Sequence, residues 1–179
     1  PSSWSADGRI FGIHEVERRQ YDIVSFTTGD TALTKVIATP DVERDPMLSP
    51  DGRWLAYTSD RSGTVEVYVR PREGTSPGVL ASAGGGREPH WVGGSELVFR
   101  SGSRIMSVAV RAGTTFDVLG APRELFDASY DFTQDTNWDV TRDGRRFVFV
   151  RNDAAARRDL MVVLNWFDEV RSAGQERRP

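Results

Sequence analysis

Residues 48–69 read LSPDGRWLAYTSDRSGTVEVYV, and this stretch decides the fold of the chain. The pair Asp51-Gly52 stands directly before the apolar run of residues 54–57. An Asp-Gly pair between short apolar strands is a strong hairpin signal, because both residues tolerate the backbone angles of a tight turn. A further β-type run follows at residues 66–69, so the stretch predicts consecutive antiparallel strands.

The pattern returns along the chain, which makes it an internal repeat. Its four copies are residues 4–13 (WSADGRIFGI), 48–57 (LSPDGRWLAY), 91–99 (WVGGSELVF) and 140–149 (VTRDGRRFVF). Steps of 44, 42 and 50 residues separate the marker glycines Gly8, Gly52, Gly94 and Gly144. These steps match the about 40–50 residues of a four-stranded propeller blade.

Further strand signals follow each hairpin. Every copy has a strand that opens on a charged residue, at residues 22–24, 66–69, 104–108 and 159–162. The first three copies add a fourth strand, at residues 34–37, 79–80 and 124–126, and only residues 168–173 suit a short helix. We therefore predict an all-β fold, a β-propeller of about four antiparallel four-stranded blades. These blades form a partial ring, and the last blade is one strand short.

The repeat also sets the expected domain organisation. We place the partial propeller at residues 1–167, a polar C-terminal tail at 168–179, and the blades at about 1–43, 44–86, 87–134 and 135–167. Propellers commonly close by letting the two chain ends share one blade, which removes exposed sheet edges. We expect the missing strand to come from residues upstream of Pro1, which implies a truncated N-terminus and a native C-terminus.

Residues 48–69 closely resemble the TolB-like propeller repeat, with its Ser-Pro-Asp-Gly-Arg turn, Ser-Asp-Arg loop and strand of the Glu-Val-Tyr-Val type. The four copies cover nearly the whole chain. The third departs at Gly93-Gly94 and the fourth at Thr141-Arg142. Residues 161–170, MVVLNWFDEV, resemble the C-terminus of a subgroup in which the propeller follows a bacterial serine/threonine protein kinase or stands as an envelope protein. The resemblance favours a periplasmic or extracytoplasmic location.

Composition excludes several function classes. The net charge of -3 gives no reason to expect nucleic acid as a partner. Cysteine is absent, so disulfides, thiolate metal sites and a cysteine nucleophile are excluded. No apolar run approaches the roughly 18 residues of a membrane span, so we expect no direct membrane insertion of this segment.

The sequence shows no convergent chemical site, and we predict no catalytic, cofactor-binding or metal-binding residues. His14 and His90 lie in different blades. The recurring Asp7, Asp51 and Asp143 are explained by Asp-Gly turns, which we favour over a ring of metal ligands. No kinase motif and no Gly-x-Ser-x-Gly motif occurs. We expect the recurring aromatic residues to form the core between blades, namely Trp4, Trp54, Trp91, Trp138 and Phe149.

Charged residues are expected to gather on one rim of the propeller. The turns between second and third strands share a face, and they hold Arg18, Arg19, Arg61, Arg100, Arg104, Arg157 and Arg158. The connectors between blades reach the same face with Asp41, Glu43, Asp45, Asp127 and Asp131. Two interpretations stay open: a surface that binds a peptide or partner protein, with Arg18, Arg19, Arg61, Arg157 and Arg158 at its centre, or a solvated rim.

These observations predict a non-catalytic module that binds or senses a protein or peptide, with no cofactor. The alternative is a regulatory or gating propeller of a larger enzyme, either a serine/threonine kinase sensor domain or a prolyl-oligopeptidase-type peptidase. Unpaired sheet edges recruit partners. We therefore also predict a homo-oligomer through open blade edges, for example two chains that build one closed ring.

Overall fold

The computed structural model describes residues 3–30, 32–128, 138–150 and 160–163. The chain divides into two compact units, residues 1–128 and 129–179, which are described separately. Every regular element of the described residues is a β-strand. Within them, no helix has the length and apolar character that a bilayer crossing requires.

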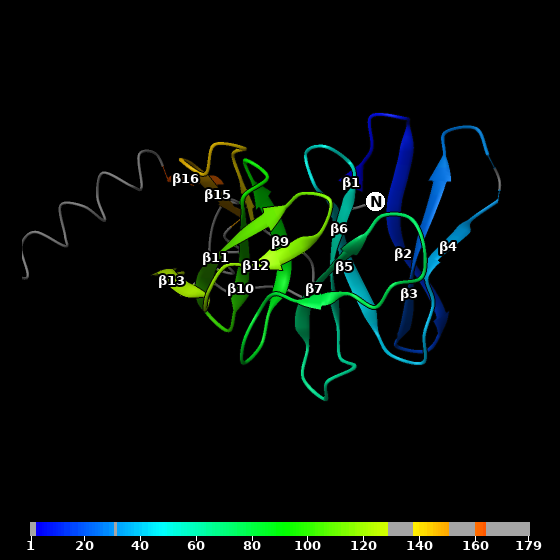
Figure 1. Cartoon of the computed structure of the whole chain (residues 1–179), viewed down its shortest axis with the longest axis horizontal. Coiled ribbons are helices and arrows are strands. Elements are labelled where there is room, and N and C mark those ends of the chain that lie inside the picture. The colour runs from blue at the N-terminus through cyan, green and yellow to red at the C-terminus, as the bar shows by residue number, and fades with distance from the viewer. Residues whose placement is uncertain (1–2, 31, 129–137, 151–159, 164–179) are drawn as a thin grey trace, which may run out of the picture. The chain divides into compact units, whose positions relative to one another are not determined.

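The first unit contains three antiparallel sheets (Figure 1). The first sheet has the order β1 (Ser3–Trp4), β2 (Arg9–Glu17), β3 (Gln20–Thr27) and β4 (Thr34–Ile37). The second has the order β5 (Glu43–Leu48), β6 (Trp54–Ser59), β7 (Glu66–Pro71) and β8 (Val79–Leu80). The third consists of β9 (Arg87–Val92), β10 (Glu96–Ser101), β11 (Arg104–Ala112), β12 (Phe116–Val118) and β13 (Arg123–Asp127).

The second unit contributes a sheet with three described strands, β14 (Trp138–Val140), β15 (Phe147–Val150) and β16 (Leu160–Val163). The prediction of an all-β fold with four antiparallel sheets and a shorter last one is therefore confirmed for the described residues. The expected short helix at residues 168–173 and the tail at 168–179 lie outside them. The blade boundaries given above stay predictions.

The third sheet differs from the expected four strands by one additional hairpin. The long strand β11 pairs with β13 along its first half and with β12 along its second half, where Ala112 lies opposite Phe116. This hairpin places the Phe116 ring 5.5 Å from Trp54 and 6.2 Å from Trp91, between the second and third sheets. An aromatic core residue therefore comes from a segment that the repeat pattern does not mark.

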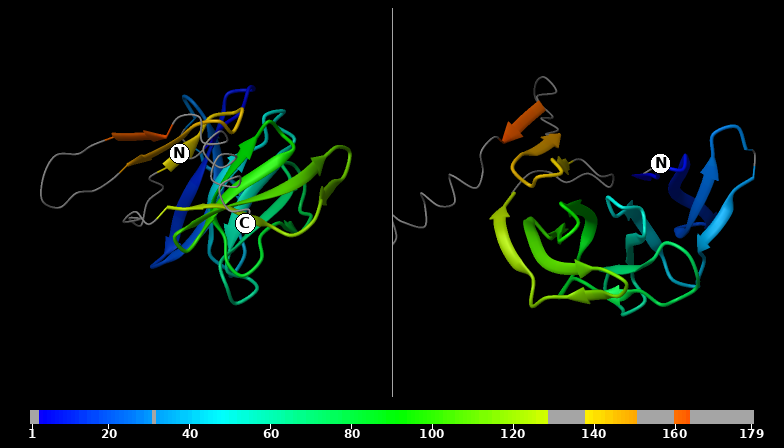
Figure 2. Two further views of the ribbon diagram at one scale, coloured as in Figure 1. Left: turned by 90° about the vertical axis from the view of Figure 1, so that its left-hand side faces the viewer. Right: turned by 45° about the horizontal axis from the view of Figure 1, so that its top comes forward.

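The core of the first unit lies between neighbouring sheets, which follow one another around an arc (Figure 2). Successive residues of β6 point to opposite faces of the sheet. Leu55 packs toward Phe11 and Ile23 of the first sheet, whereas Ala56 packs toward Leu97 of the third sheet. Because both faces are covered, all six residues of β6 are buried. Each buried large apolar side chain contributes about 1.5–3 kcal/mol.

The first hairpin is one residue tighter than the second. The Ser5 N–H donates to the Arg9 carbonyl, whereas the corresponding N–H of Ser49 donates to Trp54. Trp4 consequently pairs with Ile10, as Leu48 pairs with Leu55. The expectation that Trp4 belongs to the core between blades is wrong, because its side chain is 68% exposed.

Candidate functional site

Because the strands are antiparallel, successive turns lie at opposite ends of the strands in each of the three sheets. We define the front rim as the β2–β3, β6–β7 and β10–β11 turns with the two connectors between sheets, which are residues 18–19, 60–65, 102–103, 38–42 and 81–86. The back rim consists of the β1–β2, β5–β6 and β9–β10 turns and the segments that follow β3, β7 and β11. The predicted arginine site belongs to the front rim.

The β2–β3 turn carries Arg18 and Arg19, and both of them are exposed. Arg19 has φ of 72°, a conformation that non-glycine residues rarely adopt. Its backbone N–H donates to Glu15 Oε1 at 3.1 Å, and this bond fixes the turn. No ion pair of either guanidinium group is found among the described residues.

Arg61 of the β6–β7 turn is exposed but held by its own sheet. Its guanidinium group lies 3.7 Å from the centre of the Tyr68 ring, a cation–π contact. Its Nη2 donates to the Gly78 carbonyl at 2.6 Å. Arg61 is therefore less available to a partner than the predicted site requires. The remaining predicted residues, Arg157 and Arg158, lie outside the described residues, as does Asp131.

The third front-rim turn holds its arginines in ion pairs. Arg100 donates from Nε and Nη2 to the two carboxylate oxygens of Glu88, at 3.1 and 2.8 Å. Both side chains are nearly buried, with 13% and 5% exposed. Arg104 lies 3.7 Å from Glu124 on the surface. Arg100 therefore stabilises the third sheet, whereas Arg104 makes only an exposed ion pair.

Two of the predicted connector acids, Glu43 and Asp45, turn into the protein rather than outward. Glu43 is 1% exposed and bonds to Thr39, and burial raises the pKa of its carboxyl group. Asp45, at φ of 53°, accepts bonds from Thr58 at 3.1 Å and from the Glu88 N–H at 3.2 Å. Burial likewise raises the pKa of Asp45. Asp127 is exposed and Asp41 is half-buried, so among the described connector acids only Glu43 and Asp45 are withdrawn from the front rim.

Asp45 and Glu88 share a conformation that sequence reasoning missed. Each has φ of 53° and stands before a proline, Pro46 or Pro89, in the innermost strand of its sheet. Together they link the second sheet to the third, because the Glu88 N–H bonds to Asp45 and the Glu88 carboxylate bonds to Arg100. The only sequence signal for this link is the recurring Arg-acid-Pro triplet at residues 44–46 and 87–89.

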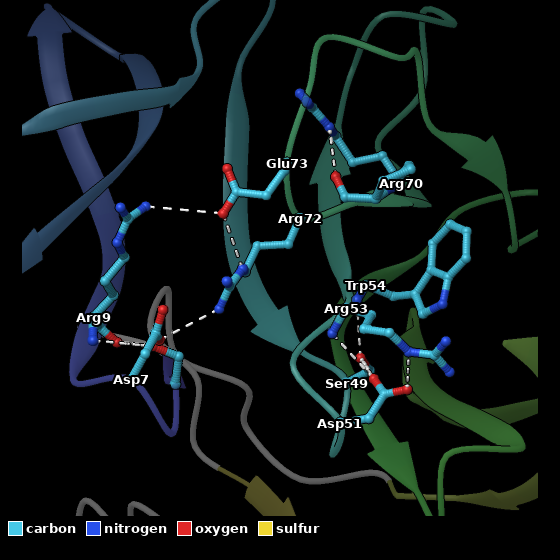
Figure 3. A network of polar contacts seen from close by, with 11 residues as sticks. Asp7, Arg9, Ser49, Asp51, Arg53, Trp54, Arg70, Arg72 and Glu73 are labelled. Carbon is cyan, nitrogen blue, oxygen red and sulfur yellow. Dashed lines mark hydrogen bonds and ion pairs between the residues drawn. The ribbon is translucent and has the colours of Figure 1, made fainter. Parts of the chain in front are cut away.

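The back rim uses the recurring aspartates in its turns. Asp51 accepts bonds from Ser49 at 2.6 Å and from the Arg53 N–H at 3.1 Å (Figure 3). In the second unit, Asp143 of the β14–β15 turn makes the corresponding bonds with Thr141 and Arg145. The interpretation of these residues as turn caps is therefore confirmed.

Asp7 also links the first two sheets. Its carboxylate accepts a bond from Arg72 at 3.3 Å, and Arg72 lies 3.2 Å from Glu73. Glu73 in turn lies 3.9 Å from Arg9 of the first sheet (Figure 3). The back rim is therefore largely neutralised by its own ion pairs.

The Asp51 turn gives a test that depends on pH. Partial burial raises the pKa of Asp51, but the bonds from Ser49 and Arg53 outweigh it and hold the pKa at about 2. A lowered folded-state pKa stabilises the protein above the unfolded value of about 3.9, and this stabilisation is lost as the pH falls toward 2. We expect Asp51→Asn to cost at most about 1 kcal/mol at pH 6, because the exposed carboxylate is screened by water.

The measurement is urea unfolding of the two proteins between pH 6 and pH 2. The difference in unfolding free energy should shrink over the lower half of this range. Asp30→Asn removes one carboxylate at an exposed position after β3, and it serves as the control for the change in net charge. A difference for Asp51→Asn that stays constant down to pH 2 would contradict the role of the charged carboxylate.

The histidines lie apart, as expected from their positions in the sequence. His14 is exposed on β2, whereas His90 is 7% exposed on β9 of the third sheet. Trp54 and Trp91 belong to the core between the second and third sheets, and Trp138 stacks on Phe147 and Phe149 within the fourth sheet.

No family model matches the chain. A curated relative, an uncharacterised protein of Agrobacterium fabrum, is 28% identical over 123 residues, which are 68% of this chain and 38% of the relative.

Three solved structures have a similar fold. TolB from Acinetobacter baumannii has a TM-score of 0.65 at 17% identity, covering 91% of this chain and 40% of TolB. The putative TolB from Agrobacterium tumefaciens has a TM-score of 0.54 at 23% identity, covering 70% of this chain and 49% of that protein. A putative 6-phosphogluconolactonase from Bacteroides uniformis has a TM-score of 0.52 at 13% identity, covering 90% of this chain and 53% of that protein.

These likenesses show the fold, which is the β-propeller found in TolB and TolB-like proteins. The chain spans about two fifths to one half of the lengths of the curated relative and the TolB structures. The activity and the partners of the corresponding whole protein are therefore proposals.

Proposed function

We propose that the chain is a non-catalytic β-propeller module that binds a protein or peptide partner at the front rim, centred on the β2–β3 turn. One observation carries the proposal. Residues 13–19 form an uninterrupted exposed run that ends in Arg18 and Arg19, whereas the corresponding strand of the second sheet is buried throughout. Binding residues are often presented on loops by a rigid scaffold, and a propeller is such a scaffold.

The charges of this turn favour an acidic segment as the ligand. Guanidinium groups form paired, charge-assisted hydrogen bonds with carboxylates. Arg18 and Arg19 are exposed, whereas Arg61 and Arg100 are already engaged by Tyr68 and Glu88. The partner surface that fits them is an exposed peptide segment with glutamate or aspartate residues.

The structural roles of the ionisable residues support a module without a catalytic site. Asp51 and Asp143 cap turns, and Asp45 and Glu88 join two sheets. His14 and His90 lie on different sheets. The four acidic residues have structural uses and the two histidines lie on separate sheets, whereas a catalytic site needs several groups that converge on one reacting atom.

The proposal is tested by fluorescence anisotropy with a labelled octa-glutamate peptide, with octa-lysine as the charge-reversed probe. We expect octa-glutamate to bind and Arg18→Glu/Arg19→Glu to weaken binding by at least about tenfold, which corresponds to about 1.4 kcal/mol. Arg9→Glu/Arg111→Glu makes the same charge change at exposed positions near the back-rim ends of β2 and β11. Equal loss in both double variants, or no binding by the unchanged protein, would refute the β2–β3 site.

We also propose that the chain associates with a second copy through open sheet edges. Exposed strand edges present unpaired N–H and C=O groups to other chains. In the first sheet, β1 pairs with only Ile10 and Phe11 of the nine-residue strand β2. In the second sheet, the corresponding strand β5 reaches along β6 as far as Ser59.

A further inference from the structure

Two arginines of the front rim are not explained by the link between the second and third sheets. They begin the two Arg-acid-Pro triplets, Arg44 in β5 and Arg87 in β9. Both strands are the innermost of their sheets, and both begin at the front rim. Each strand shifts its pairing register beside its triplet, after Arg44 in β5 and after Arg87 in β9. The two arginines therefore occupy equivalent places on neighbouring sheets.

The backbone of each triplet is strained just after its arginine. Asp45 and Glu88 both have φ of 53°, which non-glycine residues rarely adopt. Bulges and strained residues of this kind redirect side chains, and they are common beside functional sites. In this chain they bring the acidic side chains to internal partners, Thr58 for Asp45 and Arg100 for Glu88. The preceding arginine is then the charged residue of the triplet that remains on the rim.

Arg44 is held in place while its donors stay unused. Its guanidinium carbon lies 3.8 Å from the centre of the Tyr21 ring, at the start of β3. Within the described part of the chain, this guanidinium group has no hydrogen bond and no ion pair. A guanidinium group over a ring keeps its N–H groups in its own plane, where a carboxylate can accept them. Arg61 differs, because its Nη2 already donates to the Gly78 carbonyl.

Arg87 is the more accessible of the two arginines. Its side chain is exposed, and its guanidinium group makes no hydrogen bond or ion pair with any residue that the structure describes. Its charge lowers the pKa of Asp45, although burial raises that pKa by more. The acids of the connector before β5 are themselves bonded there, Asp60 to the Val42 N–H and Asp41 to Thr39. The donors of Arg87 are therefore available to an external acceptor.

We infer that Arg44 and Arg87 form a second contact for the acidic peptide, which runs along the front rim from the β2–β3 turn to the third sheet. Arg44 continues this path, because the Tyr21 ring beneath it follows Arg19 by two residues. The ligand is an extended segment with carboxylates at several points along its length. This inference rests on the proposed function and adds the path of the ligand.

The spacing of the sheets sets the length of this ligand. Packed sheets lie roughly 10 Å apart, and an extended chain advances about 3.3 Å per residue, so about three residues separate contacts on neighbouring sheets. A peptide of eight residues is about 26 Å long when extended and can therefore reach all three sheets.

The test measures octa-glutamate binding by fluorescence anisotropy for Arg87→Gln and for Arg44→Gln/Arg87→Gln. We expect the dissociation constant to rise by about twofold or more in the single variant and by about fivefold or more in the double variant, the range for exposed charge pairs. Arg87→Gln should fold as the unchanged protein does, because its side chain is exposed. It keeps the test decisive if the loss of Arg44 from the Tyr21 ring disturbs the first sheet.

Arg9→Gln/Arg111→Gln is the matched control, since it removes two positive charges near the back-rim ends of β2 and β11. Distant exposed charges are screened by salt, so the dissociation constant should stay within about twofold. An equal loss in both double variants would reflect net charge alone and would overturn the second contact. Binding that depends on Arg18 and Arg19 but not on Arg44 and Arg87 would overturn it too, while the β2–β3 site stands. No binding by the unchanged protein would overturn both.

Discussion

Replacing Gly86 with alanine is expected to destabilise the chain by roughly 1–3 kcal/mol, the range for overpacking a well-filled site. A Cβ atom on Gly86 would lie 2.7 Å from Ser82 Cβ and 2.9 Å from Val67 Cγ2. Real Cβ contacts are essentially never shorter than 3.0 Å, so something must move. Urea unfolding at neutral pH measures the effect.

The neighbours of Gly86 are held in place and cannot move away at low cost. Ser82 Oγ accepts the Val67 N–H at 2.7 Å and donates to Glu66, which also accepts the Gly85 N–H at 2.9 Å. Val67 is fully buried in the core between the second and third sheets. A shift of Ser82 would therefore break a buried network, and buried polar groups without partners are costly.

Gly113→Ala is the control for this prediction. A Cβ atom there meets only the Thr115 carbonyl oxygen at 3.8 Å, and the backbone is outside the positive-φ region. We expect a change within about 0.5 kcal/mol, because the new methyl group fits without strain. If Gly86→Ala were as mild as Gly113→Ala, the connector would have to be looser than the structure shows.

The connector at residues 84–87 shows what the sequence does and does not reveal. Its three consecutive glycines indicate a flexible link between blades, and Gly84 and Gly85 do have positive φ. Gly86 has a different role. Ser82 and Val67 leave no room for a side chain at this position, so only glycine fits. Glycine composition cannot distinguish these two reasons, because one is local and the other depends on residues brought near by folding.

Strand positions were predictable because the alternation of residues and the Asp-Gly turns are local signals. The expected fourth strands at residues 34–37 and 79–80 coincide with β4 and β8. β12 was missed, because it is an additional hairpin within one repeat rather than part of the shared pattern. Periodicity detects the strands that all copies share, but it does not detect a strand that occurs in one copy alone.

The rim positions of the arginines could be predicted from the sequence, but whether their side chains are available to a partner could not. Strand order alone places Arg18 and Arg61 on one rim, and both are exposed there. The engagement of Arg61 by Tyr68 and the burial of Glu43 depend on packing within and between sheets. In the sequence, such residues cannot be told apart from charged residues that stay in solvent. No local pattern therefore reveals the contacts that they make after folding.

Replacing Arg100 with methionine is expected to cost roughly 3 kcal/mol, because removing one partner of a buried ion pair leaves the other charge poorly compensated. Glu88 is 5% exposed and receives two bonds from the Arg100 guanidinium group. Glu88 also bonds through its N–H to Asp45 of the second sheet. The substitution therefore weakens both the third sheet and its link to the second.

Arg104→Met is the matched control, since Arg104 lies 3.7 Å from Glu124 with both side chains about half exposed. Exposed pairs contribute about 0–1 kcal/mol, so this variant should unfold close to the unchanged protein in urea. The double variant Arg100→Met/Glu88→Gln distinguishes charge from packing. A neutral amide costs less to bury than a carboxylate, so the double variant should be more stable than Arg100→Met alone. If it were less stable, the loss in Arg100→Met would come from packing of the arginine stem rather than from the buried charge left at Glu88.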